Sequence, residues 1–143
     1  MRIAYKKVGE ELKVVNTTER YWGECAEKII GCELAQWVWL DDKHTLSIMV
    51  DEEGLRKDLK TNFLMAFTSE DFPIQKMVGT VVFVRTKPVP LFSEIYDYEI
   101  DDLTDNDIEV IEKFILSEEH QDELSKKFKD YGRGYTVFRP IVW

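Results

Sequence analysis

The sequence of 143 residues predicts a single α+β domain, in which an antiparallel or mixed β-sheet carries two principal helices on one face. Three observations support this prediction. Hydrophobic residues make up 44% of the chain and aromatic residues 13%, enough for one packed core. Segments that alternate like strands are interleaved with segments of helical periodicity. No repeat or linker divides the chain, so residues 1–143 are treated as one domain.

Two hairpins are predicted in the first fifty residues. Apolar and polar residues alternate over 2–8, and the apolar pattern resumes at 12–15, so these segments are expected to pair. The stretches 33–40 and 44–50 are rich in residues that favour strands, and Asp-Asp-Lys at 41–43 separates them as a tight turn.

The first helix is predicted between these hairpins, over residues 18–30. Its apolar residues recur at helical spacing, Thr17 or Thr18 is the expected N-cap, and Gly31 is the expected end. The polar stretch 55–62 shows no clear period and is interpreted as a loop or short helix.

The run Val-Gly-Thr-Val-Val-Phe-Val at 78–84 is the best candidate for a central strand. Its nearly continuous β-branched residues indicate burial on both faces of a sheet. Pro88 and Pro90 follow closely, and proline lacks the N–H that a sheet ladder needs. A surface connection, without a regular strand, is therefore predicted after the run.

A second helix is predicted over 104–117. Thr104 and Asp107 have the spacing of a capping box, and isoleucines at helical spacing follow them. The last part of the chain, 117–143, is expected to form a further helical piece and then an edge strand at 135–143.

Several of these motifs, in the same order, resemble a family known as domain of unknown function 3846. The resemblance covers roughly residues 1–116, and Cys32 and Asp51 depart from the family pattern, which usually has Gly and Asn there. The family is carried mainly by bacteriophages and other mobile elements of Gram-positive bacteria, so the resemblance implies an accessory protein directed against host defence, with no catalytic residues to transfer. The segments that carry it are Ile29–Glu33, Val50–Gly54, Asn62, Val78–Val84 and Leu103–Ile108.

Charge is distributed unevenly along the chain. The formal net charge is -9, the wrong sign for a protein that binds nucleic acid by neutralising phosphates. Residues 94–123 contain thirteen Asp or Glu and one basic residue, Lys113, so this segment carries -12 while the rest carries +3. Acidity is therefore a local property, and direct nucleic-acid binding is not expected.

The acidic segment is the leading candidate site. Asp105, Glu109 and Glu112 are spaced to form one helical stripe, and like charges at such spacing cost about 0.2–0.5 kcal/mol per pair. A solvated helix face is the simpler interpretation. The functional one is a phosphate-like array for the basic groove of a host nucleic-acid enzyme, as in anti-CRISPR or anti-restriction proteins. The predicted protein-binding residues are Asp101, Asp102, Asp105, Glu109 and Glu112.

A basic group supplies the alternative hypothesis. Arg133 lies between two glycines and precedes Tyr135, so the pair suits a phosphate and a stacked base, and Arg56 and Lys60 are candidates to join them. This interpretation makes the chain a sequestering protein for a signalling nucleotide. Charge pairing with the acidic segment is the simpler account of these residues. A structural or interaction domain is the third possibility.

Other classes of function find no support in the sequence. Cys25, Cys32, His44 and His120 lack the spacing of metal ligands or of a redox pair, so no metal and no cofactor are expected. No nucleophile motif is present, and an enzyme is not predicted. The N-terminus lacks a signal-peptide core and no stretch approaches the ~20 apolar residues of a membrane span, so a cytoplasmic protein is expected. The sequence leaves open whether it is a monomer or a homo-oligomer.

Overall fold

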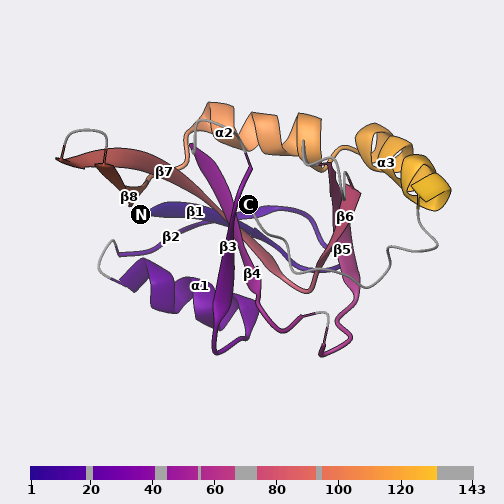
Figure 1. Ribbon diagram of the computed structural model, residues 1–143, viewed down its shortest axis with the longest axis horizontal. Helices are drawn as coiled ribbons and strands as arrows, with labels where there is room; N and C mark the ends of the chain where they lie inside the picture. Colours follow the sequence, from indigo (N-terminus) through magenta and orange to yellow (C-terminus); the bar gives the residue numbers. More distant parts are fainter. Residues whose placement is uncertain (19–20, 41–44, 55, 67–73, 93–94, 132–143) are drawn as a thin grey trace.

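The computed structural model describes residues 1–18, 21–40, 45–54, 56–66, 74–92 and 95–131, apart from the side chains of 95–97 and 129–131 (Figure 1). The predicted turn at 41–43 and the predicted edge strand at 135–143 lie outside the described residues. The elements are β1 (Arg2–Lys6), β2 (Lys13–Asn16), α1 (Trp22–Ile30), β3 (Ala35–Trp39), β4 (Leu46–Asp51), β5 (Thr61–Ala66), β6 (Ile74–Val78), β7 (Val81–Phe92), β8 (Ile95–Asp101), α2 (Asp105–Val110), the π-helical turn η2 (Ile111–Ile115) and α3 (Glu118–Tyr131).

The strands form one large and one small antiparallel sheet. The large sheet has the order β2-β1-β7-β4-β3, and β8 pairs with β7 as a sixth strand, while β5 and β6 pair with each other. The α+β class, the antiparallel sheet and the pairing of both N-terminal hairpins are confirmed.

The predicted central strand is confirmed as β7, with a different start. Residues 81–84 are completely buried between β1 and β4. Val78, however, ends β6, because Gly79 turns the chain with a φ of +71°. The single run expected from the sequence is therefore divided between two strands that belong to different sheets.

The prediction that Pro88 and Pro90 exclude a regular strand is wrong, because β7 continues to residue 92. Arg85 pairs with β4 on one side and with β8 on the other, and the N–H of Thr86 donates to the carbonyl of Thr45 on the β4 side. Alternate residues of a strand present their backbone to the same side. The proline nitrogens therefore face away from β8, so their missing N–H groups cost no bond to β8.

The helices cover both faces of the sheet, whereas one face was expected. Ala26 of α1 packs in a cluster with Val82, and Ile111 of η2 packs in another cluster with Phe83. Adjacent residues of a strand point to opposite faces, so the two helices lie on opposite sides of β7 (Figure 1). A strand that is apolar on both faces needs cover on both, which is the physical reason for this arrangement.

The predicted end of α1 is confirmed and its predicted start is wrong. Gly31 adopts a left-handed conformation with a φ of +78°, and its N–H donates to the carbonyl of Glu27 at 2.8 Å. At the other end Tyr21 is the N-cap residue and no side chain caps the helix. Thr18 contributes only its carbonyl, which accepts the N–H of Tyr21 at 3.0 Å.

The small sheet was not predicted from the sequence, and the stretch 55–62, interpreted as a loop or short helix, ends inside β5. The further helical piece expected after residue 117 is confirmed as α3, and Gln121 fastens it to β5. The Gln121 amide donates to the carbonyls of Leu64 at 2.9 Å and Ile115 at 2.7 Å, and its oxygen accepts the Leu64 N–H at 2.8 Å. One side chain thus takes the place of a neighbouring strand at the edge of β5.

Candidate functional site

The start of α2 is held rigidly against the sheet. The predicted capping box is confirmed: Asp107 accepts the N–H of Thr104 at 2.9 Å, and the Thr104 hydroxyl accepts the N–H of Asp107 at 3.0 Å. The second carboxylate oxygen of Asp107 accepts a hydrogen bond from the guanidinium of Arg85 on β7 at 2.7 Å. Because Asp107 is only 5% exposed, this ion pair fixes the helix to the central strand.

The five predicted protein-binding carboxylates lie along the segment from the end of β8 to η2, and we call this group the acidic surface. Asp101 is half-buried and accepts the N–H of Asp102, whereas the other four residues are exposed. The group consists of Asp101, Asp102, Asp105, Glu109 and Glu112.

Arg2 of β1, which the sequence analysis did not single out, brings Asp102 and Asp105 together. Its backbone N–H donates to the Asp102 carboxylate at 2.6 Å, and its guanidinium lies 2.9 Å from the Asp105 carboxylate. Glu109 pairs with Lys113 one turn further along the helix. Within the described part of the chain, Glu112 forms no ion pair.

These ion pairs leave the acidic surface available to a partner. The Asp105 side chain is 94% exposed although it contacts Arg2, and the Glu109–Lys113 pair is also solvent-accessible. Exposed pairs are worth only about 0–1 kcal/mol, so a partner's cation can replace the internal one at little cost. Within the described residues these five carboxylates meet three cations, namely Arg2, Lys113 and the N-terminal ammonium, which lies 3.8 Å from Asp102, so the surface keeps a negative charge.

The acidic residues after this surface belong to a different helix. Had Glu118 and Glu119 ended the preceding helix, its dipole would oppose them, but they lie in the first turn of α3. There the dipole favours negative charge. The Ser117 hydroxyl accepts the N–H of His120 at 3.3 Å and so marks the new helix start.

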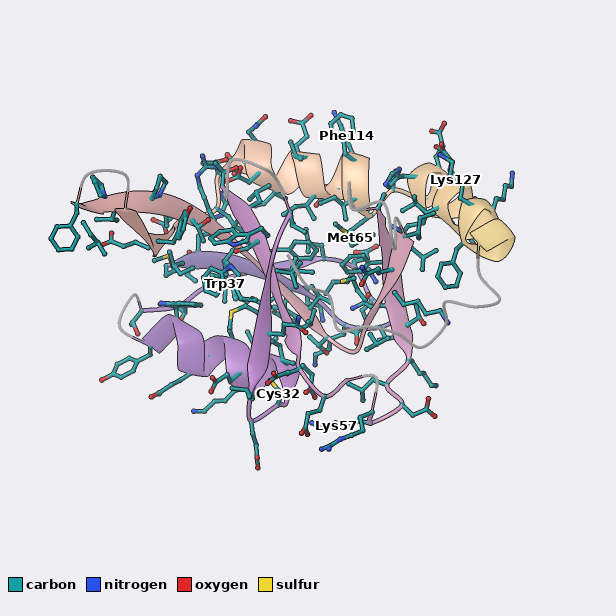
Figure 2. All side chains as sticks on the ribbon, in the orientation of Figure 1. Cys32, Trp37, Lys57, Met65, Phe114 and Lys127 are labelled. Carbon is teal, nitrogen blue, oxygen red and sulfur yellow. The ribbon has the colours of Figure 1, made fainter. Side chains whose placement is uncertain are left out.

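Phe114 is an exposed aromatic residue two positions after Glu112 in the sequence. It lies on η2, is 67% exposed, and projects from the upper edge of the molecule in Figure 2. The π-helical turn is closed by the N–H of Leu116 donating to the carbonyl of Ile111 at 2.9 Å. The sequence contains a signal for this exposure, because Phe114 lies off the stripe formed by the isoleucines at 108, 111 and 115.

The alternative nucleotide site is only half within the described residues. Arg56 is 78% exposed and pairs with Glu53 at 2.7 Å, and Lys60 is exposed. Arg133 and Tyr135 lie outside the described residues. The structure therefore does not bring these four residues together or separate them.

Lys57, which lies between Arg56 and Lys60 in the sequence, contacts a buried carboxylate. Its ammonium lies 2.7 Å from Asp51, whose side chain is 5% exposed, and this hydrogen bond raises the pKa of Lys57 above its ordinary value of 10.5. Burial, followed by the charge of Asp51, raises the pKa of the Cys32 thiol above 9.0. Cys32 is therefore a poor nucleophile at neutral pH.

The described residues contain no cluster of His, Cys, Asp or Glu suited to a metal ion. Among the helices in the described ranges, none combines the length and apolar character that a membrane crossing requires.

The residues that carry the family resemblance have structural roles. The Asn62 side chain donates to the carbonyls of Lys6 and Gly79 at 2.7 and 2.8 Å and accepts from the Lys6 ammonium at 2.7 Å. A Cβ at Gly54 would lie 2.9 Å from the Val78 side chain. These contacts join the small sheet to the large one.

Comparison with models of protein families, with curated proteins and with solved structures gives no significant match.

Proposed function

We propose that this chain is a non-catalytic inhibitor, encoded by a phage or mobile element, that binds a host defence enzyme through the acidic surface. The partner class is a nucleic-acid enzyme with a basic groove, such as an RNA-guided nuclease or a restriction endonuclease. The resemblance to a phage-borne family supports the genetic context, and the charge of the surface supports the partner class.

One observation carries the proposal: exposed carboxylates stand on a frame that is itself anchored. The capping box and the buried Arg85–Asp107 pair hold α2, so the backbone that carries Asp105 and Glu109 is already ordered before a partner binds. A basic groove attracts such an array over long range and raises the association rate, and its Arg and Lys side chains pair with the carboxylates on contact.

The test uses a panel of purified RNA-guided nucleases and restriction endonucleases, each cleaving its own DNA. We expect the chain to inhibit at least one of them in competition with DNA, and inhibition to weaken as salt is raised. The variant with Asp105→Asn, Glu109→Gln and Glu112→Gln should need about tenfold or more protein for the same inhibition.

A matched control changes the net charge by the same amount elsewhere. Glu11→Gln, Glu33→Gln and Glu52→Gln replace three exposed carboxylates outside the acidic surface. This control should inhibit like the wild type. The proposal fails if no enzyme of the panel is inhibited, or if the acidic-surface variant inhibits as well as the control.

A further inference from the structure

Helix α3 packs on the small sheet through few apolar side chains. Eight of its fourteen residues are charged, and within 118–128 only Leu124 is buried. Leu124 is in neither the core cluster around Phe83 nor the one around Val82. A helix of this length is marginal in water without packing. The position of α3 therefore depends on a small number of contacts with β5, β6 and η2.

Gln121 makes contacts that imitate a paired strand. Its oxygen accepts the N–H of Leu64 at 2.8 Å, and its nitrogen donates to the carbonyl of Leu64 at 2.9 Å. Two residues that form a hydrogen-bonded pair in an antiparallel sheet exchange the same two bonds. Since these groups of Leu64 face Gln121, they point away from β6. A side chain thus closes the outer edge of β5 at the place where another strand would pair.

The strand under this cover has little protection of its own. β5 has the sequence Thr-Asn-Phe-Leu-Met-Ala, without a charged residue or a proline. Its register irregularity lies at the start, between Thr61 and Phe63, and the register from Leu64 to Ala66 is regular. Edge strands are usually protected from pairing with other chains by charge, proline, a bulge or a covering element. For the regular part of β5, the covering element in the described structure is α3.

The connection to α3 is short and not helical. Leu116 and Ser117 alone separate the π-helical turn η2 from α3. Figure 1 shows α3 beside β5 and β6 at one end of the molecule, whereas α2 lies over the large sheet. A few residues between packed elements are enough for a hinge. Rotation at this link moves α3 away from β5 and leaves the capping box and the ion pair of α2 in place.

We propose that α3 is a detachable cover for the edge of β5, and that a chain whose α3 has separated pairs its β5 with the β5 of a second copy. Antiparallel pairing about a two-fold axis at Leu64 replaces both hydrogen bonds that Leu64 makes with Gln121, because each Leu64 then offers a carbonyl and an N–H to the other. A second copy is therefore an occupant that matches this edge. The closed position of α3 prevents this association.

Hydrogen exchange of the full chain, measured by NMR, tests the opening. We expect the amides of Leu64 and of α3 to exchange at similar rates, at least tenfold faster than those of residues 81–84 in β7. Gln121→Ala should raise exchange at Leu64 and α3 about tenfold or more and leave residues 81–84 unchanged. The matched control is Asp122→Ala, which removes an exposed side chain from the same helix and should exchange like the wild type. Loss of protection at 81–84 together with Leu64 means that α3 separates only when the whole fold opens, and this result overturns the proposal.

Sedimentation velocity tests the pairing of β5 with a second copy. Gln121→Ala should dimerise at least tenfold more strongly than the wild type or Asp122→Ala. Adding Ala66→Lys to Gln121→Ala places a charge at an exposed position on the same edge of β5. This double variant should lose the dimer while its Leu64 amide still exchanges fast. The proposal is also overturned if Gln121→Ala and Asp122→Ala associate equally, or if Ala66→Lys leaves the dimer unchanged.

Discussion

Replacing Asp107 by alanine should destabilise the fold far more than the same change at Asp105, two residues away. Asp107 is 5% exposed and uses one oxygen for the capping box and the other for Arg85. Loss of the capping interaction costs about 1 kcal/mol. Breaking a buried ion pair costs about 3–5 kcal/mol, and because the Arg85 side chain is 31% exposed we reduce this to about 1–2 kcal/mol.

The expected loss is therefore about 2–3 kcal/mol, which at about 3 °C per kcal/mol lowers the melting temperature by about 6–9 °C. The Asp105 side chain is 94% exposed, so Asp105→Ala should cost less than about 0.5 kcal/mol. Thermal and urea unfolding followed by circular dichroism measure both. Arg85→Gln should add little in the Asp107→Ala background, because its partner is already absent. Equal losses for the two aspartates, or fully additive losses for Arg85 and Asp107, would refute this reasoning.

Three further predictions follow from buried or half-buried groups. The ionised side chain of Gln121→Glu cannot donate to the Leu64 carbonyl, so this variant should be less stable than Gln121→Ala at pH 7. At acidic pH the protonated carboxyl can donate, and the stability of the variant should rise again. Urea unfolding of both variants at both pH values measures the difference. Alkylation of Cys32, followed by mass spectrometry, should have a midpoint above pH 9.0, and Asp51→Asn should lower that midpoint. Because Asp51 raises the pKa of Lys57, their ion pair should stabilise the fold at neutral pH. This stabilisation should be lost as the pH rises through values above 10.5, where Lys57 loses its proton. Asp51→Asn should therefore make the melting temperature less dependent on pH in that range.

Local patterns predicted the elements whose signals lie in their own residues. The capping box, the Gly31 helix end and the fully buried run at 81–84 depend on nearby backbone geometry or on apolar periodicity, and these were found in the structure. The strand after Pro88 was missed because proline was judged without knowing which edge of β7 has a partner. That information belongs to the sheet topology, which distant residues determine.

At the candidate site, too, features that depend on neighbouring residues were predictable and features that depend on distant residues were not. Asp105 and Glu109 lie exposed on α2, as their helical spacing predicts, whereas Glu112, the third residue of the predicted stripe, lies exposed on the π-helical turn η2. The role of Arg2 was not predictable, because it lies about a hundred residues from Asp102 and Asp105 and meets them only after β1 has joined the sheet. Likewise, nothing around Gln121 in the sequence indicates that its amide pairs with the backbone of β5.

The position of β7 between β1 and β4 has a consequence for synthesis of the chain. On the ribosome, both N-terminal hairpins emerge well before β7, so the strand edges that β7 will join are temporarily unpaired. Unpaired edges attract other strands, either from the opposite hairpin or from neighbouring chains. Because β1 and β7 pair across more than seventy residues, closure of the sheet is slow compared with hairpin formation. Expression at low temperature or with a chaperone should therefore raise the yield of folded protein more than any change at the exposed carboxylates.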